Sequence, residues 1–185
     1  KLTNKCNAKC SFCIERDGYS PNPTTIVKLA EATNAIEDYR DVLILGGEPL
    51  LSNELEGYLS MIKPYKDNIY ITTNGSLLNK YKAEMLSKYL TAINISIHHY
   101  SEFLNDRVYG IHIDFNNIIE AIKVFKQHGV KVRVNCNLVK GVLDTKRDVE
   151  NMILFVKDTL GSDEIRFNEL QNAEELYVDA RELFD

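Results

Sequence analysis

Short β-rich runs alternate with helix-length segments along almost the whole chain, and this alternation limits the fold more than any other feature. We expect strands at residues 42–45, 68–72, 92–97, 131–135 and 164–167, with a shortened first strand at 2–4. Strands that alternate with helices in this way form parallel βαβ units with right-handed crossovers. The sequence therefore predicts an α/β fold, either a barrel, open or closed, or a doubly wound sheet.

The segments between these strands have helical spacing. Residues 115–129 place apolar side chains on one face, and Gly129 stands where the helix would end. Residues 144–161 show the same pattern and also end in a glycine. In residues 50–62, Asn53 precedes a glutamate by three positions, which predicts a capping box at the start of a helix.

Length and composition describe an ordinary globular protein. The 185 residues suit one domain, so we expect 1–185 to be a single core domain, trimmed at its N-terminus because it begins with Lys1 and with trimming of its C-terminus left open. The net charge of −5 and the lack of a lysine or arginine block disfavour nucleic acid as a partner. No apolar run reaches membrane-spanning length, so no membrane partner is expected. Clustered thiols without a secretory pattern favour the reducing cytoplasm.

Three of the four cysteines, Cys6, Cys10 and Cys13, lie within eight residues at the start of the chain. Zinc needs a fourth ligand, and the remaining cysteine, Cys136, lies far away in an expected strand. A four-iron cluster, by contrast, can be held by three thiolates and keep one iron open for a small ligand. The spacing favours a cluster, and a zinc knuckle that borrows a histidine or aspartate remains the alternative.

The second expected strand ends in a glycine-rich turn, Gly46, Gly47, Glu48 and Pro49. Glycines allow close backbone approach, and proline fixes the direction in which the chain leaves. A phosphate cradle would present N–H donors without a nearby negative charge. Because this turn carries a carboxylate, it favours a cationic or donor-rich group such as an ammonium.

Together these two motifs resemble the radical S-adenosylmethionine (radical SAM) superfamily. The resembling residues are Cys6, Cys10, Cys13 and Phe12 in "CNAKCSFC", followed by "GGEP" at 46–49. The resemblance implies a partial (β/α)6 TIM-like barrel of parallel strands. It also implies that the cysteines bind a [4Fe–4S] cluster and that the open iron chelates the methionine end of S-adenosylmethionine. The glycine-rich turn would then accept hydrogen bonds from its amino group, and the phenylalanine would lie near the adenine.

The resemblance assigns further polar residues at strand ends to S-adenosylmethionine. Asn74 follows the third strand, although a turn role explains it equally well. Ser96 and His98 on the fourth strand would contact the carboxylate or the ribose, and Asn135 on the fifth would be another ligand contact. Many relatives have an acidic residue where this chain has His98. Three residues of the last strand could serve the substrate: Arg166, Asn168 and Glu169.

The reaction that the resemblance implies is reductive cleavage of S-adenosylmethionine. An electron from a reductant such as flavodoxin or ferredoxin would yield methionine and a 5′-deoxyadenosyl radical, which abstracts hydrogen from a peptide or small-molecule substrate. The cysteines would then be cofactor ligands and not nucleophiles.

Two other functions remain open from the sequence. The protein could be an activating enzyme that installs a glycyl radical on a large partner. It could also be a non-catalytic iron–sulfur or zinc module.

Overall fold

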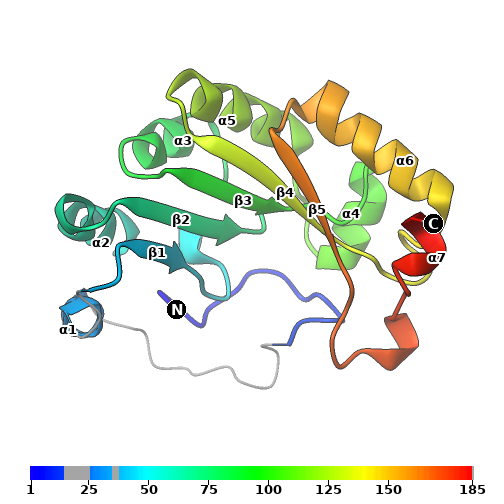
Figure 1. Ribbon diagram of the computed structural model, residues 1–185, viewed down its shortest axis with the longest axis horizontal. Coiled ribbons are helices and arrows are strands. Elements are labelled where there is room, and N and C mark those ends of the chain that lie inside the picture. The colour runs from blue at the N-terminus through cyan, green and yellow to red at the C-terminus, as the bar shows by residue number, and fades with distance from the viewer. Residues whose placement is uncertain (15–25, 35–37, 185) are drawn as a thin grey trace.

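The computed structural model describes residues 1–14, 26–34 and 38–184 (Figure 1). Its described strands form one parallel sheet in the order β1-β2-β3-β4-β5: β1 (Asp41–Ile44), β2 (Asn68–Thr73), β3 (Ala92–Ser96), β4 (Lys131–Asn137) and β5 (Glu164–Asn168). The described helices are α1 (Ile26–Asn34), α2 (Leu55–Ile62), α3 (Lys80–Ser87), α4 (Glu102–Tyr109), α5 (Phe115–Gln127), α6 (Lys146–Leu154) and α7 (Arg181–Phe184). None of these helices is both long and apolar enough to cross a membrane.

The predicted α/β class and partial-barrel architecture are confirmed, with one correction. The segment expected as a first strand, 2–4, is not a strand. It nevertheless runs beside the end of β1, where the Leu2 N–H donates to the Leu45 carbonyl at 2.6 Å. The Gly47 N–H donates to the Thr3 carbonyl at 2.9 Å. The described sheet therefore has five strands, and the N-terminal segment covers its first edge without extending the ladder.

The two faces of the sheet differ because side chains alternate along each strand. In β2, Ile69 and Ile71 are fully buried, whereas Tyr70 and Thr72 on the opposite face are only partly buried. Helices α2, α3, α5 and α6 lie along one side of the sheet, and the N-terminal segment passes on the other (Figure 1). The apolar core thus lies under the helices, and the polar face is left to line a site.

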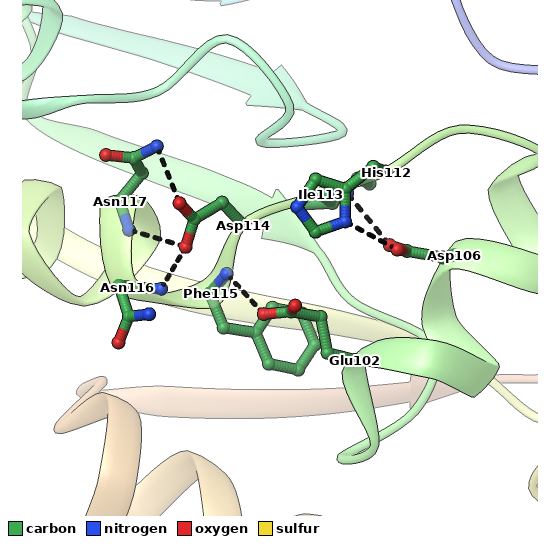
Figure 2. Close-up of polar contacts among 8 residues, drawn as sticks. All are labelled: Glu102, Asp106, His112, Ile113, Asp114, Phe115, Asn116 and Asn117. Atoms are coloured by element: carbon green, nitrogen blue, oxygen red, sulfur yellow. Dashed lines mark hydrogen bonds and ion pairs between the residues drawn. The ribbon is translucent and has the colours of Figure 1, made fainter.

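The ends of the helices follow local capping chemistry. Asp114 caps α5 by accepting the Asn116 N–H at 2.8 Å (Figure 2), and Gly129 after this helix has φ +74°, as its predicted place at the helix end requires. The capping box predicted at Asn53 is wrong. Helix α2 begins at Leu55, and Glu54 occupies the N-cap position without a side-chain hydrogen bond.

Helix α6 begins after Thr145, whose hydroxyl accepts the Asp148 N–H at 3.1 Å. It continues as a π-helical segment, Phe155–Leu160, and ends at Gly161 with φ +65°. The helix predicted within 144–161 is therefore confirmed, with its last part in a wider helical form.

Candidate cofactor site

A cavity of about 390 Å³ lies at the carboxyl ends of the strands, where ligands of parallel sheets bind. The three cysteines that the sequence singles out, Cys6, Cys10 and Cys13, all line it. Seven of the other predicted cofactor residues also line it: Phe12, Gly46, Gly47, Asn74, Ser96, His98 and Asn135. The fold therefore brings together residues that are more than a hundred positions apart in the sequence.

The cysteine loop is held against helix α4. The Lys9 N–H donates to the Tyr109 carbonyl at 2.8 Å, and the Cys13 N–H closes a turn on the Cys10 carbonyl at 3.2 Å. Cys6 and Cys13 are exposed, and Cys10 is partly buried. The loop thus has a fixed backbone and leaves its thiols facing the cavity and the surface around it.

Asn7, which lies between the first two cysteines, fastens the loop to the segment after β2. Its side-chain oxygen accepts from Asn74 Nδ2 at 3.0 Å, and its Nδ2 donates to Ser76 Oγ at 2.9 Å. The Ser76 hydroxyl in turn donates to Asn74 Oδ1 at 2.7 Å. These three side chains form a closed set of hydrogen bonds between two loops that are far apart in the sequence. Asn74 therefore has a structural role in addition to its place on the cavity wall.

Glu48 is completely buried and turned inward. One carboxylate oxygen accepts from the Leu50 N–H at 2.9 Å and from Thr73 Oγ1 at 2.7 Å, and the other accepts from the Asn74 N–H at 2.7 Å. Burial raises the pKa of Glu48, although these three donors oppose the rise. Neither Glu48 nor Pro49 is part of the cavity wall. Contact between the Glu48 carboxylate and a cofactor stays a prediction, and in this structure the carboxylate braces the glycine turn.

The structure shows why residues 46 and 47 must be small, which the sequence did not reveal. A Cβ atom on Gly47 would lie 2.4 Å from the Lys5 carbonyl oxygen, and one on Gly46 would lie 2.7 Å from the Thr3 carbonyl oxygen. The close approach that these residues allow is therefore to the chain that leads into Cys6. Both glycines still line the cavity, although the Gly47 N–H is already bonded to the Thr3 carbonyl.

His98 is a neutral, buried histidine. Burial lowers its pKa to about 3, and its Nδ1 accepts the Asn137 N–H at 3.1 Å, which places the ring proton on Nε2. The ring meets Phe12 edge-on with centroids 5.1 Å apart and stacks on Tyr109 at 5.0 Å. The position thus offers the cavity a neutral hydrogen-bond donor.

The polar wall of the cavity continues onto β4 and β5. Asn135 Oδ1 is buried and has no hydrogen-bond partner among the described residues. Asn168 Nδ2 donates weakly to Asn137 Oδ1 at 3.4 Å. An unpartnered buried acceptor is unusual and costs free energy, so Asn135 fits a site in which a ligand supplies the missing donor.

Several functional positions escaped the sequence analysis. Tyr109 lines the cavity, and its buried hydroxyl donates to the Ser96 carbonyl at 2.8 Å, but its only sequence signal is its place at the end of a helix. Asn7 has no signal beyond lying inside the cysteine motif. Of the residues suggested for substrate, Asn168 and Glu169 line the cavity and the exposed Arg166 does not.

The thiols of the cysteine loop lie close enough together to affect one another's titration. Burial raises the pKa of Cys10 to about 12, and the charges of Cys13 and Cys6 add to the rise. Burial also raises the pKa of Cys6, where Glu48 and Cys13 contribute repulsion. Three thiolates so close together need a cationic centre among them. These residues therefore fit a cationic iron–sulfur group.

An open parallel sheet with a three-cysteine loop over its carboxyl ends defines an α/β protein with a cavity lined by thiols. The sequence profile of the Radical SAM superfamily matches residues 1–156, and the chain belongs to that superfamily. It is accordingly an enzyme of the radical SAM class.

Curated relatives include GTP 3′,8-cyclases. The protein from Petrotoga mobilis is 30% identical over 184 residues, which cover 91% of this chain and 53% of the relative. The protein from Aliarcobacter butzleri is 28% identical over 165 residues, which cover 84% and 50%. The chain therefore spans about half the length of the curated relatives it matches.

Solved structures share the fold. Streptococcus suis SuiB bound to S-adenosylmethionine superposes with a TM-score of 0.76 at 22% identity, over 96% of this chain and 43% of SuiB. SuiB bound to its precursor peptide SuiA gives a TM-score of 0.75 at 24% identity, over 90% and 37%.

Proposed function

We propose that this chain holds a [4Fe–4S] cluster through Cys6, Cys10 and Cys13 and binds S-adenosylmethionine in the adjoining cavity. The observation that carries the proposal is that all three cysteines and the polar ends of the strands line one cavity of about 390 Å³. When bound, the cluster and S-adenosylmethionine supply a 5′-deoxyadenosyl radical that abstracts hydrogen from a substrate. The substrate we propose is a peptide or a small molecule.

The residues of the cavity divide the binding of S-adenosylmethionine among them. Backbone carbonyls at Gly46 and Gly47 would accept from its amino group, because the Glu48 side chain is occupied elsewhere. His98 would donate through Nε2, since its Nδ1 is already an acceptor. Asn135 would accept a hydrogen bond at its unpartnered oxygen. The Phe12 ring, held edge-on against His98, would cover an apolar surface of the adenine.

The names of similar proteins suggest two substrates to test. The relatives named GTP 3′,8-cyclase make GTP one candidate, and the SuiB structure with a precursor peptide makes a peptide the other. The amide side chains of Asn135, Asn137 and Asn168 on the cavity wall can pair with peptide groups or with a nucleobase. We therefore expect substrate trials with both classes to be informative.

The experiment is anaerobic reconstitution with iron and sulfide, followed by incubation with S-adenosylmethionine and dithionite. We expect about four irons per chain and the appearance of 5′-deoxyadenosine and methionine. Cys6→Ala, Cys10→Ala and Cys13→Ala should each lose the cluster and the product. Cys136→Ala is the matched control, because this thiol is fully buried in the core and lines no part of the cavity. Zinc without sulfide in strictly anaerobic wild-type protein would overturn the proposal.

A further inference from the structure

A groove with a basic rim lies beside the cysteine loop and outside the cofactor cavity. Its volume is about 130 Å³, and Arg107 and Lys140 stand on its rim. Ser11 and Phe12 of the cysteine loop form part of its wall. Apart from Gly141, the rest of the wall is apolar and consists of Leu104, Val108, Val139, Val142 and Leu176. We call this feature the basic groove.

A third cation, Lys9, lies at the end of the helix that carries Arg107. A Cβ atom on Gly110 would lie 3.4 Å from the Cβ of Lys9, and Arg107 lies three residues before this glycine at the end of α4. Lys9, Arg107 and Lys140 are all exposed. Lys9 belongs to the loop that carries the cysteines, and Arg107 and Lys140 border the groove that this loop helps to form. We call these three cations the basic surface.

This local charge is not neutralised by the acidic residues of α4. Figure 2 shows that Glu102 and Asp106 are turned toward the connection between α4 and α5. Glu102 Oε2 accepts the Phe115 N–H at 2.9 Å, and Asp106 accepts the Ile113 N–H at 2.8 Å and contacts His112 Nδ1 at 2.7 Å. Among the residues described in the structure, none forms an ion pair with the three cations of the basic surface.

The basic groove is separated from the cofactor cavity by the side chain of Phe12, which lines both spaces. A substrate must enter the cavity to meet a radical formed there. A molecule in the groove would instead lie within one or two residues of Cys10 and Cys13 without entering the cavity. This position suits a partner that needs only closeness to the thiolate-held group.

We propose that the basic groove docks an acidic one-electron carrier protein. The inference rests on the proposed function, which requires an electron from outside. The carrier would give up one electron to the group that the three thiolates would hold, with no change of bonds or protons. The unpaired cations attract the carrier over a distance, and the apolar wall gives it a surface to bury.

The test compares two electron sources for the reconstituted enzyme. The variant R107E/K140E reverses both rim charges, and K123E/K157E on the outer helical layer is the control with the same change in net charge. With an acidic flavodoxin and its reductase as the source, we expect R107E/K140E to lower kcat/KM for flavodoxin about tenfold or more at low salt. The loss should shrink as ionic strength rises, because salt screens exposed charges. With dithionite, all three proteins should form 5′-deoxyadenosine at the same rate.

Flavodoxin binding to the cluster-free protein gives a readout that does not depend on turnover. Calorimetry should show salt-sensitive binding to the wild type and to the control, and loss of binding to R107E/K140E. Glu174 and Glu175 lie next to Leu176 of the groove wall and should repel the carrier. E174Q/E175Q is therefore expected to bind flavodoxin more tightly than the wild type.

Several outcomes would overturn the groove proposal. One is equal flavodoxin-driven rates for the wild type and R107E/K140E. Another is an equal loss with dithionite, which would mean that the two residues support the fold. Binding of an acidic peptide but not of flavodoxin would assign the groove to a substrate instead. A wild type that is inactive with dithionite would count against the proposed function, and the binding measurement would still decide the docking surface.

Discussion

Replacing Gly47 with alanine tests the link between the glycine turn and the cysteine loop. The new Cβ atom would lie 2.4 Å from the Lys5 carbonyl oxygen, 2.7 Å from its carbonyl carbon and 2.9 Å from the Asn4 carbonyl oxygen. All three are backbone atoms, so no side chain can rotate away to make room. The segment that leads into Cys6 must therefore move outward as a unit.

The cost has two parts. Overpacking of a close contact costs about 1–3 kcal/mol. The movement would also break the hydrogen bonds from the Gly47 N–H to the Thr3 carbonyl and from the Glu48 N–H to the Lys5 carbonyl, which are 2.9 and 2.8 Å long. Each contributes about 1 kcal/mol. We therefore expect the free energy of unfolding to fall by about 3–5 kcal/mol. This is a large share of the roughly 5–15 kcal/mol typical of a domain.

Urea denaturation of the cluster-free protein under reducing conditions measures this loss, and anaerobic iron loading measures its effect on Cys6. Gly57→Ala on the exposed side of α2 is the matched control, and it should be neutral or stabilising by about 0.5–1 kcal/mol. Gly46→Ala should fall between the two, because its nearest backbone contact would be 2.7 Å. If Gly47→Ala unfolded at the same urea concentration as the wild type, the close approach would be refuted.

Further predictions concern two side chains near the cysteines. Asn7→Ala should lower the free energy of unfolding by about 1–2 kcal/mol and reduce iron loading, because it removes the bonds to Asn74 and Ser76. Asn7→Asp keeps only the acceptor and should be intermediate, and equal iron loading in all three proteins would contradict this role. His98 has a lowered pKa of about 3, so its stability contribution is present above the unfolded value of about 6.5 and is lost as pH falls toward 3. Denaturation from pH 7.5 to 4.5 should show wild-type stability falling relative to His98→Gln by up to about 1.4 kcal/mol per pH unit, and a pH-independent gap would show that His98 is not buried as a neutral ring.

The strands could be predicted because the pattern of apolar residues that marks a buried strand is a property of the local sequence. The expected 92–97 and 131–135 became β3, Ala92–Ser96, and β4, Lys131–Asn137, with only their ends displaced. Strand ends depend on which carbonyls find partners across the ladder, and this depends on the neighbouring strand. The segment 2–4 has the composition of a strand, but it pairs with β1 through too few bonds to count as one.

The site was predictable as a set of motifs and not as a set of contacts. The cysteine spacing predicted which thiols belong to the site, and in the structure all three line one cavity. The sequence could not show that Glu48 points inward, because its partners Thr73 and Asn74 lie at the end of β2, far from it in the sequence. The role of Asn7 could not be predicted for the same reason, since its hydrogen-bond partner Asn74 lies 67 residues away in the sequence. Contacts between segments that are far apart in the sequence cannot be predicted from the local sequence pattern.

Phe12 lines both the cofactor cavity and the basic groove, and this affects how the site can be engineered. A residue of another size there would change the wall of both the cofactor cavity and the basic groove. Altering the proposed nucleoside contact at this position therefore also affects the neighbouring surface. Variants designed to accept modified sulfonium cofactors are best sought on the β4 wall, at Asn135 or Asn137, where only one compartment is affected.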